Sequence, residues 1–503
     1  MATGASWMVV MRMFDRGLGV ISTVILARLL LPSDYGLVAM ASGFAELLSL
    51  VAAFGFDSAL IQRSDSSRAH FDTAWTLNVL LGLFIGAALL GFAPLVADYF
   101  SEPRLTGIMR VMAMSPILNG FCNIGTVLFR KDLNFQLEAV YMALRRILGF
   151  GVTLAAAYWF RSYWALVAGT VATALAGLVL SFVLHPYRPR LTLTERASLF
   201  GFSAWLFLNN IIRFTNTRAL EIIIAKHAGS RALGLFSVAN DIASLPTSEL
   251  SAPINRALFP GYARFQDDDA QLRRLVLEVF ALLALVALPA GVGIAALASL
   301  LVPVMLGANW LDAIPIVQIL AFSCVMTVMQ NNSYLVYLVK GRPQITTWIG
   351  GSFAVLQALL VVTLLPGHGV IGAAIGVLLS RACYIPIELG MLMRILAIRP
   401  RAFSDVMLRP IAASVVMWWV VTALAQEIEI LGAGQGLLAL LGVALCGALV
   451  FAMVVLLLWR LSGKIESGER LLLKLVPGGS QVERVLLKML RFPIQRPEQS
   501  AGG

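Results

Sequence analysis

The feature that most constrains this chain is a succession of apolar runs, each long enough to cross a bilayer. A helix of about 20 apolar residues spans the hydrocarbon core. We expect fourteen such helices, near residues 7–31, 35–61, 73–98, 105–129, 136–160, 163–185, 198–225, 232–258, 275–302, 313–339, 344–365, 368–393, 405–425 and 434–459. The sequence therefore predicts an all-α, polytopic membrane protein.

The composition agrees with this interpretation and excludes several classes of protein. Hydrophobic residues make up 59% of the chain and charged residues 13%, against roughly 25% charged in soluble domains. The four cysteines (Cys122, Cys324, Cys383 and Cys446) make no pair at metal or disulfide spacing. There is no glycine-rich phosphate loop with Lys-Ser or Lys-Thr. We expect no cofactor, no metal, no ATP hydrolysis and no nucleic-acid partner.

Lysine and arginine alternate between the loops, which predicts the orientation of the chain. One set of loops carries fifteen of these residues and the opposite set carries four, namely Arg104, Arg161, Lys226 and Arg231. Since loops rich in Lys and Arg face the cytoplasm, the first set is predicted to be cytoplasmic. With an even number of spans, both termini are predicted to be cytoplasmic too. No cleavable signal segment is expected.

An internal repeat is predicted from a shift of 198 positions. The shift aligns Ala27-Arg28 with Ala225-Lys226, and Gly36-Leu37 with Gly234-Leu235. The polar linker His185–Arg196 separates the two sets of six helices. Because six spans per repeat give both repeats the same direction, the repeat axis is expected to run along the membrane normal. We predict an N-terminal lobe at 1–190, a C-terminal lobe at 191–400, accessory helices at 401–461 and an amphipathic cytoplasmic tail at 462–503.

Several passages, in this order and spacing, resemble the polysaccharide flippases (WzxC-like) of the multidrug/oligosaccharidyl-lipid/polysaccharide exporter superfamily. They are residues 25–40 (ILARLLLPSDYGLVAM), 55–63 (GFDSALIQR), 163–167 (YWALV), 256–260 (RALFP) and 341–343 (GRP). The resemblance covers roughly residues 7–400. It implies two six-helix lobes around a central cavity and a protein of the bacterial inner membrane that is not an enzyme.

The resemblance also implies the substrate and its path. It implies a flippase that exports undecaprenyl-diphosphate-linked oligosaccharide repeat units for exopolysaccharide, capsule or O-antigen biosynthesis, by alternating access of the two lobes. The lipid bilayer and this lipid-linked oligosaccharide are the expected partners, and a polysaccharide polymerase and co-polymerase are candidate protein partners. Such a substrate presents an anionic head that requires cations, a glycan that requires hydrogen bonds, and a tail that stays in lipid.

The diphosphate ligands are sought among arginines, whose planar fork binds two oxygens at once. Arg12 and Arg16 share one face of the first helix with Asp15, and they are the first candidates. Arg213 follows, because the 198-residue shift places it opposite Asp15. We hypothesise that Asp15 and Arg213 approach one another or share the ligand. The alternative is that the charges of the first helix reach toward the cytoplasmic surface.

Three carboxylates complete the candidate site, since a charge at membrane depth must be satisfied. Glu46 lies in a polar stripe of the second helix with Ser42 and Ser49, and Asp241 lies in a similar stripe of the eighth. Family members commonly carry an acidic residue in helix 7, where this chain has Leu220 with Glu221 beside it. The resemblance therefore implies Glu221 as the candidate coupling residue.

Two further features allow more than one reading. Arg145 and Arg146, adjacent in the fifth helix, fit a phosphate site or an anionic leaflet equally well. Gln330–Ser333 places four consecutive polar residues in the tenth helix, which suggests a local break or a hydrated wall. At the level of function, a peptidoglycan-precursor flippase or a drug exporter of the same fold remains an alternative. So does a membrane glycan polymerase or ligase, although every outward loop is short for such an enzyme.

Overall fold

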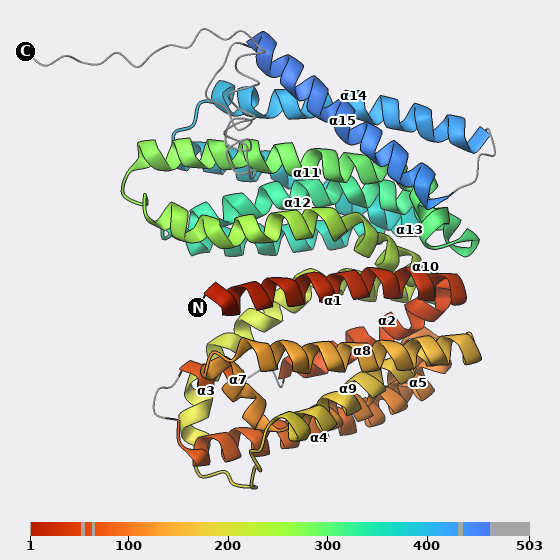
Figure 1. The fold of residues 1–503 in the computed structure, drawn as a ribbon, viewed down its shortest axis with the longest axis vertical. Coiled ribbons are helices and arrows are strands. Elements are labelled where there is room, and N and C mark those ends of the chain that lie inside the picture. Colours follow the sequence, from red (N-terminus) through yellow and green to blue (C-terminus); the bar gives the residue numbers. More distant parts are fainter. Residues whose placement is uncertain (1, 52–55, 63–65, 431–435, 463–503) are drawn as a thin grey trace, which may run out of the picture. The chain divides into compact units, whose positions relative to one another are not determined.

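The structure is a computed structural model that describes residues 2–51, 56–62, 66–430 and 436–462. Side chains are described in these ranges except at 2–6, 8–10, 12, 51, 57–58, 62, 197–217, 246, 248–257, 343, 429–430 and 462. The described residues form helices and loops and contain no strand (Figure 1). The all-α prediction is confirmed.

The helices follow the predicted apolar runs closely. Those of the N-terminal half are α1 (Ala2–Leu29), α2 (Pro32–Val51), α3 (Phe56–Gln62), α4 (Arg68–Phe100), α5 (Arg104–Met112), α6 (Met114–Gly120), α7 (Val127–Lys131), α8 (Phe135–Phe160) and α9 (Trp164–Leu184). Those that follow are α10 (Arg196–Ala263), α11 (Asp269–Met305), α12 (Ile314–Val339), α13 (Pro343–Ile395), α14 (Pro400–Ile430) and α15 (Leu437–Ser462). Short 3₁₀ turns, η1 (Ile124–Thr126) and η2 (Ala308–Ala313), precede α7 and α12.

Two of these helices are each broken at a glycine. Gly229 in α10 has φ 78° and Gly369 in α13 has φ 59°, a left-handed backbone that side chains rarely tolerate. Gly229 lies where the sequence predicts a turn between two spans, and Gly369 lies at the start of the predicted span 368–393, directly after such a turn. Among the described residues, eight helices are long and apolar enough to cross a membrane, or nine if one bent pair is counted. The chain is therefore a multi-pass membrane protein, while the count of fourteen spans stays a prediction.

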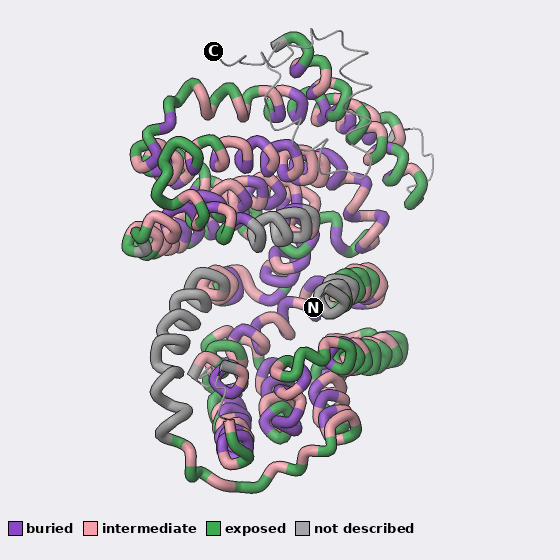
Figure 2. Tube along the Cα trace, turned by 60° about the vertical axis from the view of Figure 1, so that its left-hand side comes forward, coloured by how far each residue is buried: buried purple, intermediate pink, exposed green. Residues whose placement is uncertain are grey.

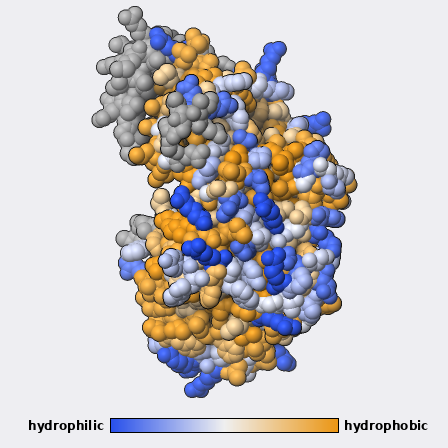
Figure 3. All heavy atoms as spheres, turned by 90° about the vertical axis from the view of Figure 1, so that its right-hand side faces the viewer, coloured by the Kyte–Doolittle hydropathy of each residue, from blue (hydrophilic) through white to orange (hydrophobic). Residues whose placement is uncertain are grey.

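The chain divides into two compact units. The first contains residues 1–240, 302–316 and 354–377, and the second contains 241–301, 317–353 and 378–503. Buried residues gather on the helix faces that meet other helices of the same unit, whereas the outward faces are exposed (Figure 2). Many of these exposed side chains are large and apolar, as the space-filling view shows (Figure 3). That pattern is expected where lipid replaces water. The predicted lobe boundaries stay a prediction.

The start of α2 is fixed by the predicted Pro-Ser-Asp turn. Pro32 is the first residue of the helix, a position where its missing N–H costs nothing. Asp34 accepts a hydrogen bond from Leu31 N (2.9 Å) and another from Tyr163 N (3.1 Å). One buried carboxylate thereby holds the α1–α2 turn to the α8–α9 turn.

One predicted span, 105–129, differs from its expected form. Its helices α5–α6 and η1–α7 are bent by 65° relative to each other, with the break near Asn123. Buried Asn123 accepts from Gly125 N and donates to the carbonyls of His185 (3.3 Å) and Tyr187 (2.7 Å). Its own N–H donates to Ser181 Oγ (2.9 Å). The apolar residues predicted one span here, whereas the Asn123 side chain binds the backbone N–H of Gly125 at the break and ties the break to the carbonyls of His185 and Tyr187.

The predicted linker is present between α9 and α10, and it is pinned along α4. Tyr187 donates to Asp72 (2.7 Å), which also accepts from Arg190 N (3.0 Å), and Thr192 N donates to Thr76 Oγ1 (3.0 Å). Burial and the hydrogen bond to Asp72 raise the pKa of Tyr187. The segment is therefore a fixed part of the first unit and not a flexible tether.

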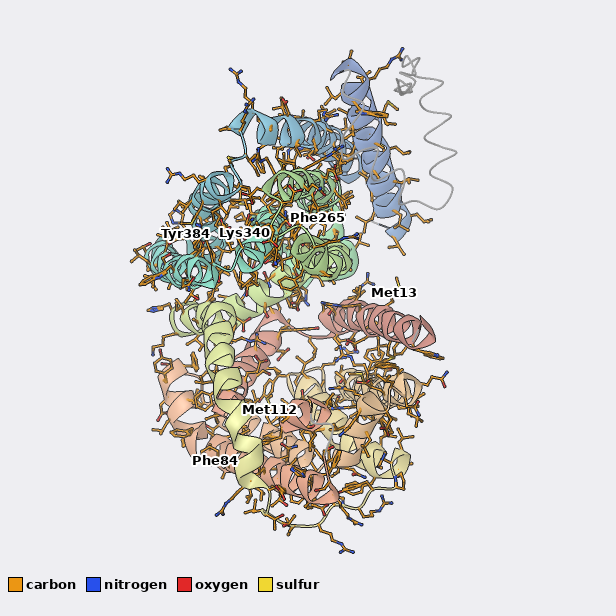
Figure 4. All side chains as sticks on the ribbon, turned by 90° about the vertical axis from the view of Figure 1, so that its left-hand side faces the viewer. Met13, Phe84, Met112, Phe265, Lys340 and Tyr384 are labelled. Atoms are coloured by element: carbon orange, nitrogen blue, oxygen red, sulfur yellow. The ribbon has the colours of Figure 1, made fainter. Side chains whose placement is uncertain are left out.

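The second unit has its own core, in which α12 runs unbroken through Gln330–Ser333. The break considered for this segment is absent. Asn332 is instead buried and accepts a hydrogen bond from Tyr262 Oη (2.7 Å). At one end of the unit, Lys340 binds Asp269 (2.5 Å) and the carbonyl of Gln266 (2.6 Å), close to Phe265 (Figure 4). The hydrogen bond from Lys340 lowers the pKa of Asp269.

Candidate functional site

The charged face of α1 meets α8 in the first unit. Asp15 on α1 forms an ion pair with Arg146 Nε on α8 (3.3 Å), and both side chains are about half exposed. Gly19 lies beside this guanidinium: a methyl group there would be 3.7 Å from Arg146 Nη2, an ordinary contact distance. Arg16 is exposed beside Asp15, 13 residues before the end of the 28-residue α1. At 1.5 Å per residue that is about 20 Å from the helix end, so Arg16 lies midway along α1.

The adjacent Arg145 points to a different neighbour. Its Nε donates to Thr173 O on α9 (3.2 Å), and its Nη2 donates to Asn119 Oδ1 on α6 (3.1 Å). Gly177 provides space for it, because a methyl group there would lie 3.0 Å from Arg145 Nε. Arg146 therefore contacts α1, whereas Arg145 contacts α6 and α9. The sequence had drawn attention to both arginines without deciding between two roles.

A second charged group joins α2 to α10. Arg218 donates through Nε and Nη2 to both oxygens of Glu46 (2.7 and 2.6 Å) and through Nη1 to Glu221 (2.7 and 2.8 Å). The side chain of Arg218 is 30% exposed, against 49% for Glu46 and 18% for Glu221. Two carboxylates around one guanidinium leave the group with one formal negative charge.

Two cavities adjoin these charges. The first, which we call the polar cavity, holds about 430 Å³ among α2, α4, α5–α6 and α9. Its polar lining is Ser42, Glu46, Ser49, Asn78, Ser115, Asn119 and Thr170, and Met112 (labelled in Figure 4) belongs to its wall. The second holds about 400 Å³ among α2, α4 and α10 and is apolar apart from Arg218 and Glu221. Glu46 and Arg218 thus connect the two.

At the α1–α2 turn the predicted repeat is visible as a reciprocal contact. A methyl group on Gly36 would overlap the carbonyl of Ser230, and one on Gly234 would overlap the carbonyl of Pro32. Ser230 and Gly234 are the 198-residue counterparts of Pro32 and Gly36. Each repeat therefore places its glycine against the backbone of the other, as small residues permit between membrane helices.

The same reciprocity holds for two cations. Arg28 donates to the carbonyl of Val304 (2.5 Å), one residue before the end of α11, and Lys226 donates to the carbonyl of Tyr99, one residue before the end of α4. Lys226 also lies over the Tyr99 ring, 4.5 Å from its centroid. Cations at helix C-termini are favoured by the unpaired carbonyls and the helix dipole. We call these four residues the cation latch.

The structure brings together only part of the predicted site. Glu46 and Glu221 meet through Arg218, which the sequence analysis did not select, although a cation three residues before Glu221 was a visible signal. Asp15 pairs with Arg146, which had no assigned role. Asp241 is exposed in the second unit, where Ser244 Oγ bonds its backbone carbonyl (3.1 Å). The side chains of Arg12 and Arg213 lie outside the described residues, so the proposed approach of Asp15 and Arg213 stays a hypothesis.

The helix arrangement defines a class. It is similar to the solved structure of the lipid II flippase MurJ in an inward closed conformation, with a TM-score of 0.67 and 14% identity over 90% of this chain and 98% of MurJ. A multidrug resistance MATE transporter of the MOP superfamily, inward-facing, gives 0.58 over 76% of this chain and 94% of that chain, at 15% identity. The fold is thus that of MurJ and MATE transporters.

The sequence places the chain more narrowly. Residues 25–315 match the family model described as "Polysaccharide biosynthesis protein", and the chain belongs to that family. It is 26% identical over 382 residues to the lipopolysaccharide biosynthesis protein WzxC of Escherichia coli, covering 75% of this chain and 77% of WzxC. It is also 26% identical over 320 residues to the succinoglycan biosynthesis transport protein ExoT of Rhizobium meliloti, covering 63% and 65%. The predicted family resemblance is confirmed.

Proposed function

We propose that the protein is a flippase that moves lipid-diphosphate-linked oligosaccharide repeat units across the bacterial inner membrane for surface polysaccharide biosynthesis. The observation that carries this proposal is the set of guanidinium groups held midway along apolar helices, at Arg16, Arg145 and Arg146. Charges at that depth are costly and are retained where they bind or conduct a charged species. The relatives named for polysaccharide biosynthesis and transport support this assignment.

The arginines suit the anionic head of such a lipid. Arg146 is held at one edge by Asp15 and remains about half exposed, so its fork retains donors for phosphate oxygens. Hydroxyl and amide groups of the polar cavity lie on the other side of Arg145, which binds Asn119. Phosphate recognition and glycan recognition are therefore adjacent in the first unit. The apolar tail of the substrate needs no protein partner in lipid.

Alternating access is supported by the reciprocal contacts at the ends of α1, α4 and α11 and near the Gly229 break of α10. The predicted topology places this end of the first unit outside the cell. The glycine contact and the cation latch then close the outer side, and export requires both to separate. An inside-negative potential favours outward movement of an anion by about 2.3 kcal/mol per charge per 100 mV. For two charges this is about 4–5 kcal/mol, so no second ion is required by energetics.

Two alternatives account less well for the site. A drug exporter needs an apolar, acidic pocket, whereas the facing helices α1 and α8 carry the exposed guanidinium of Arg16 and the half-exposed one of Arg146. A glycan polymerase or ligase needs catalytic groups on an extended outer loop, and the predicted outer loops are short. A peptidoglycan-precursor flippase shares the diphosphate chemistry and is separated from our proposal by the glycan alone.

Deletion of the gene in its host tests the proposal directly. We expect loss of surface polysaccharide together with accumulation of complete lipid-linked repeat units in the inner leaflet. Units that reach the outer leaflet without being polymerised would instead favour the polymerase. Loss of viability with accumulated peptidoglycan precursor would favour the precursor flippase.

A further inference from the structure

We propose that the polar cavity is a sugar-binding subsite that recognises the glycan of the exported lipid. The proposal rests on the proposed function, and it goes further by assigning the glycan to a pocket within the first unit. The cavity's volume of about 430 Å³ is within the range of small-molecule sites, roughly 300–1,000 Å³. Its hydroxyl, amide and carboxylate groups stand among apolar side chains such as Leu81, Ile85 and Met112, a mixture that suits a sugar ring with its hydroxyl groups and C–H faces.

One residue of the wall carries a hydroxyl without a hydrogen-bond partner. Ser115 lines the cavity, and its Oγ is buried and unpartnered. Leaving such a group unpaired is costly, and native structures seldom do so without a reason. Rotation of the Ser115 side chain toward the cavity would let a hydroxyl group of a bound sugar satisfy it as donor or acceptor.

The amide of Asn119 is oriented for the same purpose. Its Oδ1 accepts from Arg145 Nη2 (3.1 Å), so its NH₂ group is the one left to donate toward a ligand. Glu46 presents carboxylate oxygens that can accept from further hydroxyls. The wall therefore offers a donor, an acceptor and a group that can be either, which is what the mixed hydroxyl pattern of a sugar ring demands.

An aromatic pair lies close in sequence to residues of the cavity wall. Trp75 precedes the lining residue Asn78 by three positions on α4, so both share one helix face. Phe121 directly follows the lining residue Gly120 and is 36% exposed. The rings of Trp75 and Phe121 pack edge to face with centroids 6.4 Å apart, and Trp75 Nε1 donates to Phe121 O (3.4 Å). In the proposed subsite this pair, at the edge of the lining residues, would supply an apolar surface to the C–H face of a sugar.

The test compares two ligands on the purified full chain. The probes are the host's complete lipid-diphosphate-linked repeat unit and the same lipid diphosphate without sugar. We expect Ser115→Ala and Trp75→Ala each to weaken binding of the complete unit by about three- to tenfold, as loss of one or two hydrogen bonds or a stacking surface predicts. Binding of the bare lipid diphosphate should not change. Ser115→Thr, which keeps the hydroxyl, should restore binding.

Matched controls are available in the second unit. Trp348, 79% exposed on α13, and Ser404 on α14 provide a tryptophan and a serine outside the cavity. Unchanged binding of the complete unit in both cavity variants would overturn the subsite. So would equal weakening of both ligands, which indicates a structural role. Flipping of complete units by the wild-type chain in proteoliposomes, assayed separately, tests the proposed function itself.

Discussion

Gly36 and Gly234 occupy equivalent positions in the two repeats and face each other's backbones across the contact between α2 and α10. A methyl group at either position would overlap a carbonyl oxygen of the opposite repeat, at Ser230 or Pro32. Backbone cannot rotate away as a side chain can, so the whole contact would have to widen. Close approach at this point depends on both glycines.

We therefore expect Gly36→Ala to lower the stability of the closed arrangement by about 1–3 kcal/mol, the usual cost of overpacking. Flipping should slow because one state of the cycle is disfavoured. The matched control is Gly43→Ala on the same helix, where a methyl group meets nothing within 4 Å. Flipping rates in proteoliposomes and melting temperatures in detergent check this. Equal behaviour of the two variants would contradict the packing argument.

The cation latch predicts a change in accessibility. Removing the guanidinium or the ammonium, by Arg28→Ala or Lys226→Ala, should favour opening of this end by about 1–2 kcal/mol each. A cysteine placed at Leu37, which is fully buried, should then react several-fold faster with a membrane-impermeant maleimide. The double variant should react faster still. Unchanged labelling in the double variant would show that the contacts do not hold this end closed.

Variants of the Asp15–Arg146 ion pair can distinguish a role of Arg146 in substrate binding from a purely structural role. Arg146→Ala should raise the KM for the lipid-linked substrate because a phosphate ligand is lost, and Arg146→Lys should recover part of it. Exchanging the charges, with Asp15→Arg and Arg146→Asp, keeps the pair but moves the cation to α1. We expect normal expression and melting temperature with weak transport. Full transport by the exchanged variant would mean that only the ion pair matters.

Arg218 should be more important for stability than either of its partners. Arg218→Ala leaves Glu46 and Glu221 near one another without a cation, so we expect a loss of about 1–3 kcal/mol. Glu46→Gln retains one carboxylate on Arg218 and should be much milder. Thermal melting measures both. Arg274→Ala serves as the control, since Arg274 is 68% exposed in its pair with Glu278 and exposed pairs contribute about 0–1 kcal/mol.

The titration of His185, at the start of the linker, should make the stability of the folded chain depend on pH. Burial lowers its pKa, and its Nδ1 accepts a hydrogen bond from Tyr187 N (3.1 Å). The unfolded chain therefore takes up a proton at higher pH than the folded chain. Stability should fall as the pH drops below about 6.5, the ordinary histidine value, and level off below the folded pKa. His185→Asn keeps an acceptor without the titration, so its melting temperature should lose this component of the pH dependence.

Much of the architecture follows from local sequence. Apolar runs set the helices, and Pro32, Gly229 and Gly369 mark turns because their backbones cannot continue a helix or need a left-handed conformation. The bend at Asn123 was not predicted, because it depends on carbonyls of His185 and Tyr187 more than 60 residues away. Partner choice was harder still. Glu46 was selected for its depth, but which cation it meets depends on how α2 and α10 are rotated against each other.

For the candidate site, the sequence likewise indicated which residues are important better than it indicated which residues they contact. Residue type and position drew attention to Asp15 and Glu46, and the family resemblance to Glu221; all three carboxylates are in ion pairs, while their roles in the site stay predictions. The repeat alignment, built from alanines, glycines and leucines, turned out to carry the contact between Gly36 and Gly234. It could not reveal that Arg145 and Arg146 diverge, because adjacent helical residues point about 100° apart and their neighbours belong to different segments.

The cation latch resembles the interface of a two-fold symmetric homodimer, because the same kind of contact occurs twice, but here both contacts lie within a single polypeptide. In a homodimer, one mutation alters both copies of such a contact at once. Here the two copies are separate positions, Arg28 and Lys226, and each can change without the other. The chain already uses this freedom, since one copy is a planar fork and the other a single ammonium. The strength of each of the two contacts can therefore change by mutation without altering the other.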